Sequence, residues 1–354
     1  MITQRRANVI GLGLIGGSIG LALRERGWHV CGDDHDQARI DRALGLGVLD
    51  DQGIDERAEI TFVATPVLSV ADQVKRALVE TRGIVTDVGS VKGAIVAAID
   101  DPRFVGGHPM AGSELEGLDG ADPTMFTGAV WVLTPMPTTA DETFATTAAI
   151  VAELGADVVA LPPDRHDQVV AVVSHVPHLA AATLMGLASD RAEEHAALLR
   201  LAAGGFRDMT RIASGHPGIW LDICAENRDA ILGGLDGLID GLQRMREIVR
   251  DDDRAALYGR LQHAREARVN LPTRGTQPSE LAEVRIPIPD RTGAAAEVFT
   301  LAAELGVNIS SFEVVHSVEG NRGVAIVLID ALAVDLFRGG LLARGFRPAV
   351  QRLD

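Results

Sequence analysis

Residues 106–117, with the sequence GGHPMAGSELEG, gather more chemically capable side chains than packing alone requires. An imidazole gains and loses a proton near neutral pH, so His108 is a candidate general base. The glycines and Pro109 restrict the backbone around it. The preceding apolar run is typical of a β-strand. We therefore expect a site-forming segment at the end of a strand, with a purely structural histidine as the alternative.

A glycine pattern near the N-terminus predicts a dinucleotide site. The sequence NVIGLGLIGGSIG places Gly11, Gly13 and Gly16 in G-x-G-x-x-G spacing, after a strand and at the start of a helix. The first glycine permits a tight turn, the second lets the backbone approach a pyrophosphate, and the third lets helix and strand pack closely. Leu14 and Ile15 belong to the same cradle, because the free N–H groups of a first helical turn bind phosphate.

Two carboxylates follow the next predicted strand, WHVCGDD, about 20 residues after the glycines, where a ribose-binding acid is expected. Alternation along the strand favours Asp34, and Asp33 is the close alternative. A carboxylate there binds both ribose hydroxyls and repels a 2′-phosphate, which favours NAD over NADP. The alternative is the same fold without a cofactor.

Hydroxyl groups follow two later strands, in VATP and TDVGSVKG. Ligands bind at the carboxyl ends of the strands in this architecture, so Thr65, Pro66 and Ser90 are candidate site residues. For Ser90 the alternative is ordinary capping of the following helix.

The elements that must position these residues are those of an α/β chain. Apolar runs alternate with helical stretches up to residue 163 and predict a doubly wound, parallel Rossmann-type sheet. Residues 164–270 predict an all-helical substrate and dimerisation domain. Residues 271–281 predict a linker, and 282–354 a small α+β module.

Composition narrows the partners. A hydrophobic share of 47% and a charged share of 23% are globular values, and the net charge of −16 disfavours nucleic acid and anionic membrane. Cys31 and Cys224 lack the spacing of a metal site, so we expect no metal. Two cysteines so far apart are typical of a protein that stays reduced in the cytoplasm, and we expect that location. The apolar stretch 169–188 contains histidines and a proline, which favours a buried helix over a membrane span.

Five motifs resemble, in order, those of the prephenate dehydrogenases of tyrosine biosynthesis. They are GLGLIGGS, DVGSVKG, GGHPMAGSE, SHVPH, and GGFRDMTRIA with IWLDICAEN. The resemblance covers nearly the whole chain up to the end of the helical domain. It implies NAD-dependent oxidative decarboxylation of prephenate, with hydride leaving the carbinol carbon and a base holding the hydroxyl proton.

The resemblance also implies roles for individual residues. His108 matches the catalytic base, and Ser90 the hydroxyl that bridges substrate and base. Arg211 matches the arginine for the ring carboxylate, since a guanidinium fork suits that group, and His175 matches a residue that faces the pyruvyl end. Further substrate-pocket residues are assigned on the same basis: Ser113, Glu114, Arg207, Asp208 and Trp220.

The C-terminal module resembles an ACT domain, a small amino-acid sensor, in DRTG and ELGVNIS. The resemblance implies a regulatory site at Asp290, Gly293, Asn308 and Ile309, with tyrosine or another aromatic amino acid as effector. Thr292 stands where such modules usually have proline. A homodimer through the helical domain is also expected.

Three alternatives remain open at this stage. Arogenate dehydrogenase would take the transaminated substrate. A hydroxyacid dehydrogenase would need a catalytic lysine in the helical domain, whereas Lys75 and Lys92 both lie in the first half. A non-catalytic regulator that senses NAD or an amino acid would not need the histidine and arginine motifs.

Overall fold

The computed structural model contains two compact units, residues 1–246 and 247–354, which are described separately. It describes residues 4–113, 115, 117–192, 202–271, 281–289, 293–316 and 322–352. Glu114, Asp290, Thr292 and most of the predicted linker therefore lie outside the described residues. The division into three domains with a linker stays a prediction.

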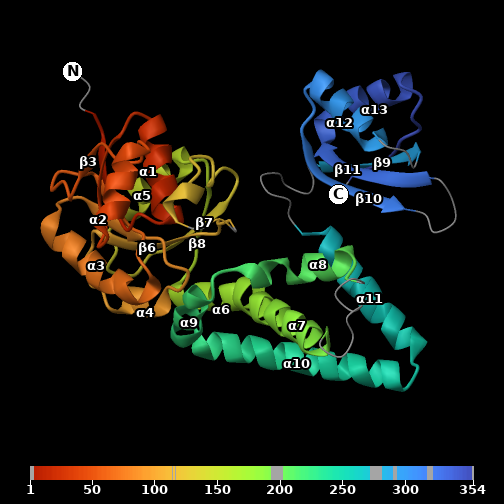
Figure 1. Ribbon diagram of the computed structural model, residues 1–354, viewed down its shortest axis with the longest axis horizontal. Coiled ribbons are helices and arrows are strands. Elements are labelled where there is room, and N and C mark those ends of the chain that lie inside the picture. The colour runs from red at the N-terminus through yellow and green to blue at the C-terminus, as the bar shows by residue number, and fades with distance from the viewer. Residues whose placement is uncertain are drawn as a thin grey trace. The chain divides into compact units, whose positions relative to one another are not determined.

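An eight-stranded sheet forms the centre of the first unit, in the order β3-β2-β1-β4-β5-β6-β7-β8 (Figure 1). The strands are β1 Arg6–Ile10, β2 His29–Asp33, β3 Asp51–Gln52, β4 Ile60–Val63, β5 Ile84–Asp87, β6 Phe104–Pro109, β7 Val130–Thr134 and β8 Asp157–Ala160. The strand order reverses beside β1, so the carboxyl ends of β1 and β4 flank the crevice where this architecture binds ligands.

Helices cover both faces of this sheet, which is why its strands are apolar without alternation. One core contains residues of α1 (Leu14–Glu25), α2 (Gln37–Gly45) and α5 (Asp141–Glu153). A second contains residues of α3 (Val67–Glu80) and α4 (Gly93–Ala97). The predicted Rossmann-type fold is confirmed.

The prediction of a wholly parallel sheet is wrong at one place, because β6 and β7 pair antiparallel. Residues 110–129 between them contain a 3-10 turn, Leu118–Gly120, and no α-helix among the described residues, and only a parallel neighbour needs a helical crossover. His108 consequently lies inside β6, paired with Val132 of β7, and not in a loop beyond the strand.

Helices follow the sheet in the first unit. They are α6 Pro163–Val170, a π-helical turn Ala171–His175, α7 Val176–Ala192, α8 Gly204–Thr210, a 3-10 turn Arg211–Ser214, α9 Pro217–Glu226 and α10 Arg228–Arg250. Val91, Ala171, Ile223 and Ile231 form their shared core with the sheet domain. The continuous helix 163–191 is long and apolar enough to cross a membrane by length and composition only. It carries the buried His166, His175 and His178, of which His166 and His175 have hydrogen-bonding partners in the same unit and His178 stacks on Trp220.

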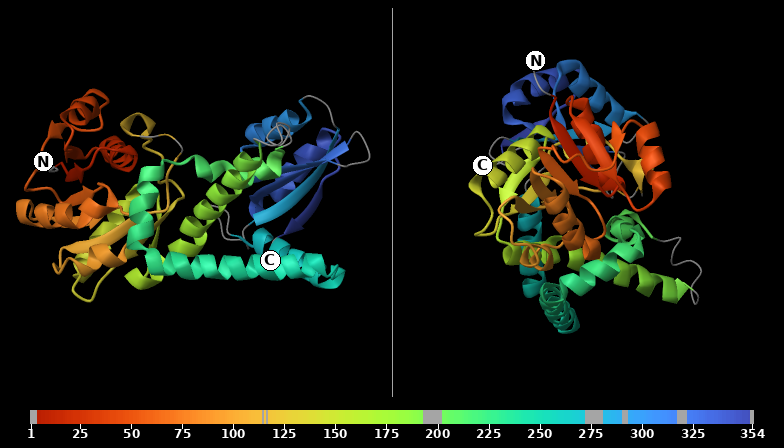
Figure 2. Two further views of the ribbon diagram at one scale, coloured as in Figure 1. Left: turned by 60° about the horizontal axis from the view of Figure 1, so that its bottom comes forward. Right: turned by 90° about the vertical axis from the view of Figure 1, so that its left-hand side faces the viewer.

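The second unit begins within the last turns of α10 and continues with α11, Arg254–Val269. Its sheet has the antiparallel order β10-β11-β9-β12. The elements are β9 Leu281–Pro289, α12 Ala294–Leu305, β10 Ile309–His316, β11 Arg322–Asp330, α13 Val334–Ala343 and β12 Ala349–Arg352. This is the βαββαβ, ferredoxin-like arrangement. Helices α12 and α13 pack on one face of the sheet (Figure 2), so alternate residues of β9 are buried.

Candidate active site

His108 is held in β6 by a close approach of neighbouring strands. A Cβ added at Gly107 would lie 2.5 Å from the Asp87 main-chain oxygen, and one at Gly106 would lie 2.4 Å from Thr134 Oγ1. Both positions therefore require glycine. This explains the paired glycines of the sequence, and it places His108, 8% exposed, at the carboxyl end of the strand.

A buried ion pair between Lys92 and Asp87 holds the same strand in place. Lys92 Nζ donates to the Asp87 carboxylate and, at 2.7 Å, to the main-chain oxygen of Gly107. The Asp87 carboxylate also accepts from the main-chain N–H groups of Gly89 and Gly107, at 2.8 and 3.1 Å. Both charged side chains are completely buried. Burial lowers the pKa of Lys92, and the facing Asp87 carboxylate opposes that effect.

His108 begins a line of hydrogen-bonding groups that ends at the start of α6. Its Nδ1 lies 2.8 Å from His166 Nε2, and His166 Nδ1 lies 2.8 Å from Asp167 Oδ1. Burial first, and then the nearby His166, Lys92 and His175, hold the pKa of His108 well below its usual value. His108 is therefore unprotonated at neutral pH, as a base must be.

The Asp167 carboxylate is the fixed end of this line. Its two oxygens accept from the main-chain N–H groups of Lys92 and Gly93, each at 2.8 Å. Although burial works to raise it, these bonds and the one to His166 hold the pKa of Asp167 below its usual value. The charged, accepting form of the carboxylate is thus built into the fold.

His175 has a different environment. Asn227 Nδ2 lies 2.9 Å from the Asp167 main-chain oxygen and 3.2 Å from His175 Nδ1, so the amide donates to both. The remaining nitrogen of His175, Nε2, must carry the hydrogen and is buried without a partner among the described residues. Burial lowers the pKa of His175 to about 4. A neutral donor with an unused N–H group does not fit a satisfied core histidine.

The glycine cradle fits a dinucleotide. Gly11 has φ +95°, and a Cβ at Gly16 would lie 1.9 Å from the Gly11 oxygen, so both must be glycine. Nothing described lies within 4 Å of a Cβ at Gly13, where the backbone is open to a ligand. No described side chain caps α1. Thr65 Oγ1, at the end of β4, is buried and without a partner among the described residues.

The two candidate ribose acids differ in their partners. Asp34 lies just beyond β2 and accepts from the main-chain N–H group of Leu12 at 2.8 Å, which places it beside the glycine cradle. Asp33 is the last residue of β2 and is paired with Arg76 at 2.7 Å. The geometry favours Asp34, as the alternation along the strand predicts.

The remaining predicted residues are more exposed. Ser90 is half-buried after β5 and does not cap α4, whose N-cap residue is Lys92. Pro66 is the exposed N-cap residue of α3. Ser113 is exposed, and its hydroxyl accepts from the Leu115 N–H group at 3.0 Å.

Three of the predicted substrate residues of the helical segment are on α8 and the 3-10 turn after it. Arg207, Asp208 and Arg211 are exposed there. A Cβ at Gly215, which follows the 3-10 turn, would lie 3.5 Å from His178 and 3.7 Å from Trp220. Trp220 stacks on His178, with ring centroids 3.5 Å apart, and meets His175 edge-on. The turn that carries Arg211 is thus next to the aromatic side of the site.

Sequence reasoning missed Asp87, Lys92, His166, Asp167 and Asn227. Asp87 and Lys92 are part of DVGSVKG, and Asn227 ends IWLDICAEN, so position within those motifs was the available signal. The His-Asp pair in LPPDRHDQ follows β8, which runs opposite to β6, so the rule that ligands bind at the carboxyl ends of the parallel strands gave no signal for it.

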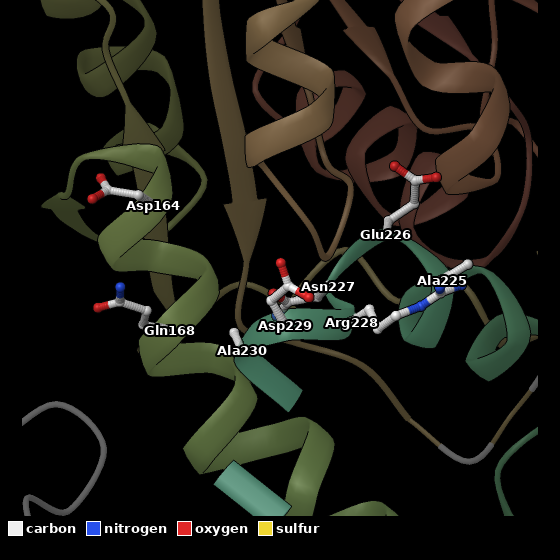
Figure 3. A pocket seen from close by; sticks show the side chains of 8 residues that line it. All are labelled: Asp164, Gln168, Ala225, Glu226, Asn227, Arg228, Asp229 and Ala230. Atoms are coloured by element: carbon white, nitrogen blue, oxygen red, sulfur yellow. The ribbon is translucent and has the colours of Figure 1, made fainter. Parts of the chain in front are cut away.

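A pocket of about 650 Å³ lies between α6 and the α9–α10 junction (Figure 3). Three of its lining residues are acidic, Asp164, Glu226 and Asp229, against one arginine, Arg228. Such a lining repels a dicarboxylate. Asn227 is common to this pocket and to the histidine cluster.

A second cluster combines possible metal ligands. His29, Cys31 and Asp51 have ligand atoms within 4.8 Å of one another. Burial first, and then the Asp55 and Asp51 carboxylates, raise the pKa of the Cys31 thiol to about 11. A metal needs the thiolate, and His29 Nε2 already faces the Asp51 carboxylate at 3.2 Å. The raised pKa of the Cys31 thiol argues against a metal at this cluster.

Comparisons with known proteins agree along most of the chain. The family model described as "Prephenate dehydrogenase, nucleotide-binding domain" matches residues 19–160, and that described as "Prephenate dehydrogenase, dimerization domain" matches 162–263. Prephenate dehydrogenase of Bacillus subtilis is 34% identical, over 89% of this chain and 89% of its own. Cyclohexadienyl dehydrogenase of Zymomonas mobilis is 32% identical, over 77% of this chain and 98% of its own.

Solved structures show the same similarity. Prephenate dehydrogenase from Aquifex aeolicus, in complex with hydroxyphenyl propionate and NAD+, has a TM-score of 0.71 and 27% identity. The match covers 77% of this chain and 99% of that one. Arogenate dehydrogenase from Synechocystis has a TM-score of 0.65 and 31% identity, over 74% of this chain and 98% of that one.

Proposed function

The chain belongs to the prephenate dehydrogenase family, and we propose that it oxidatively decarboxylates prephenate to 4-hydroxyphenylpyruvate with NAD+. The observation that carries this activity is the buried His108 at the carboxyl end of β6, joined to His166 and at the same edge of the sheet as the glycine cradle. When bound, NAD+ supplies the hydride acceptor.

The reaction needs a base that works reversibly. Hydride leaves the carbinol carbon, the bond to the ring carboxylate breaks to release CO2, and the ring becomes aromatic. The hydroxyl proton is held while the carbonyl character develops and returns to the same oxygen, because the product is a phenol. His108 Nε2 takes and returns this proton, and the Ser90 hydroxyl bridges the base and the substrate.

Other side chains bind the two carboxylates of the substrate. Arg211 holds the ring carboxylate until it departs, and the unused His175 N–H donates to the pyruvyl end. Arg207, Trp220 and Ser113 form the rim, and Asp208 orients Arg211. Glu114 lies outside the described residues and stays a predicted rim residue. NADH absorbance on mixing the protein with prephenate and NAD+ tests the activity directly, and no NADH formation at neutral pH would exclude it.

The second candidate substrate is arogenate, favoured by the similarity to the Synechocystis arogenate dehydrogenase. The pyruvyl end of prephenate is a keto acid, whereas arogenate carries an ammonium group there. The carboxylate is common to both side chains, but a neutral N–H donor at His175 suits the keto oxygen of prephenate and not the ammonium of arogenate. We therefore expect kcat/KM to be higher for prephenate, and a preference for arogenate would reverse the assignment.

Arg211→Ala is expected to raise the KM for prephenate roughly 10- to 100-fold, the worth of a charge-assisted hydrogen bond, with little change for NAD+. The physical reason is that the ring carboxylate loses its guanidinium partner while the dinucleotide cradle is untouched. Initial rates at varied concentrations of each ligand measure both constants. Equal increases for the two ligands would contradict this role.

Asp34→Ala is expected to weaken NAD+ binding and to relax the discrimination against NADP+, because the carboxylate that binds ribose and repels a 2′-phosphate is removed. Asp33→Ala is the matched comparison, since it frees Arg76 next to the same site. Dissociation constants from titration of the cofactors compare the two. A larger loss of NAD+ affinity in the Asp33 variant would transfer the ribose role to that residue.

We further propose that residues 282–354 are an ACT-type sensor for tyrosine or another aromatic amino acid. Gly293, with φ +88°, precedes α12, and Asn308 is exposed immediately before Ile309 and β10. A helix N-terminus suits the carboxylate of an amino acid, and pairing of two modules would enclose it.

Tyrosine is therefore expected to inhibit the full chain, and a chain ending at Gln277 is expected to keep its activity and lose that response. Inhibition curves for both forms provide the measurement. Equal inhibition of the two would place any tyrosine effect at the active site instead.

We also propose a cytoplasmic homodimer formed through the dimerisation domain. Leu232, Ile239 and Leu242 are exposed on α10, which has a single buried residue, Ile231. Exposed apolar residues in one stripe are typical of an interface. Sedimentation equilibrium should give twice the chain mass, and the mass of a single chain would exclude the dimer.

A further inference from the structure

The proposed reaction gives no role to His166 and Asp167. Among the described residues, they form the one buried line of hydrogen bonds that reaches His108. We propose that these two residues set the tautomer of His108, so that its Nε2 faces the substrate as a hydrogen-bond acceptor. They act through His108 and are positioning residues. The inference rests on the proposed function, because it concerns the base of that reaction.

The first step is the direction of the bond between Asp167 and His166. A carboxylate only accepts, and Asp167 is held in that form by the main-chain N–H groups of Lys92 and Gly93. Oδ1 therefore accepts a hydrogen from His166 Nδ1, 2.8 Å away. The hydrogen of a neutral imidazole is then on Nδ1, which leaves a lone pair on His166 Nε2.

The second step is the direction of the bond between His166 and His108. The lone pair on His166 Nε2 faces His108 Nδ1 at 2.8 Å, and the bond forms only if His108 supplies the hydrogen. A neutral His108 with hydrogen on Nδ1 has its lone pair on Nε2. The opposite tautomer would place two lone pairs against each other in a buried space and would present N–H to the substrate hydroxyl.

The third step is the charge that forms when the base is protonated. His108 Nε2 accepts the substrate proton and the ring becomes an imidazolium until the proton returns to the phenol oxygen. The other groups near it are His166 and Asp167 of α6, His175 of the π-helical turn, and Lys92, which is neutralised by Asp87. Among these described groups, only His166 offers an acceptor to Nδ1 of the charged ring, so the line through His166 stabilises that state.

A purely structural role makes a different prediction. If His166 only fills space, an aromatic ring of similar size should serve as well, and an amide should not. If it sets the tautomer, the acceptor matters: phenylalanine offers none, whereas glutamine presents an oxygen at the position of Nε2.

The test compares His166→Phe with His166→Gln in the full-length protein. We expect His166→Phe to lower kcat by roughly 10²–10⁴-fold, the range for a base lost or held in the wrong tautomer, and His166→Gln to recover at least about a tenth of the wild-type value. The KM for NAD+ should stay within about twofold in both, which also shows that the variants fold. The loss in His166→Phe should be uniform from neutral to alkaline pH, since deprotonation cannot correct a tautomer.

Equal turnover of the two variants would overturn the proposal. Nitrogen NMR of the histidine-labelled wild-type protein gives a second reading that needs no stable variant. His108, assigned by the signal absent from His108→Asn, should carry its hydrogen on Nδ1, and a hydrogen on Nε2 would also overturn the proposal. Failure of the wild type to form NADH would instead remove the proposed function.

Discussion

Replacing His108 by asparagine should lower kcat by roughly 10²–10⁴-fold and leave NAD+ binding intact. The amide nitrogen of asparagine occupies the place of imidazole Nδ1 and can still donate to His166 Nε2, so the buried line is preserved. What the variant lacks is Nε2, the atom that takes the substrate proton. Steady-state rates with prephenate, together with NAD+ titration, separate the two properties.

The same base predicts the pH profile of the wild type. Because burial lowers the pKa of His108, the unprotonated form persists as the pH falls through 6.5. The acid side of the kcat/KM profile should therefore lie well below that pH and should be absent from His108→Asn. Near-normal turnover in the variant would remove His108 from the reaction.

Replacing Lys92 by methionine should reduce the free energy of unfolding by about 3–5 kcal/mol, the cost of leaving one partner of a buried ion pair alone. Asp87 has no exposed surface, and its carboxylate would keep only two main-chain donors. The Gly107 oxygen would lose its donor as well. Urea unfolding followed by circular dichroism measures the change.

The double variant Lys92→Met, Asp87→Asn is the matched control. It removes both charges while the amide can still accept from a main-chain N–H group, so it should recover part of the lost stability. If the single variant loses less than about 1 kcal/mol, or the double variant is no better than the single one, the pair does not act as a buried ion pair.

The sequence was sufficient for the parts of the site that have a local cause. Gly11, Gly13 and Gly16 predict a dinucleotide cradle because each position must lack a side chain for a different steric reason. The structure shows that a Cβ would clash at Gly11 and at Gly16. His108 was identifiable because glycines and a proline surround it. The apolar, non-alternating strands likewise predicted a sheet covered on both faces.

The parts that the sequence did not reveal depend on distant contacts. His166 lies 58 residues from His108, and a His-Asp pair at a polar helix start resembles a solvated surface. Their meeting depends on β7 running antiparallel to β6, which strand patterns alone do not indicate. The burial of Lys92 was equally hard to predict from the sequence, because it depends on the closeness of Gly106 and Gly107 to neighbouring strands.

The π-helical turn 171–175 constrains the number of residues in this segment more than their identity. It joins α6 and α7 into one helix, with His166 and Asp167 before it and His175 at its end. A π turn holds one residue more than an α turn, so removing one residue would let the segment close as ordinary α-helix with α6 and α7 keeping nearly the same faces. Adding one residue at the exposed Val172 or Val173 would instead rotate α7 by about 100° relative to α6 and turn His175 away from Asn227. An insertion should therefore be more damaging in this segment than a deletion of one residue or a point mutation.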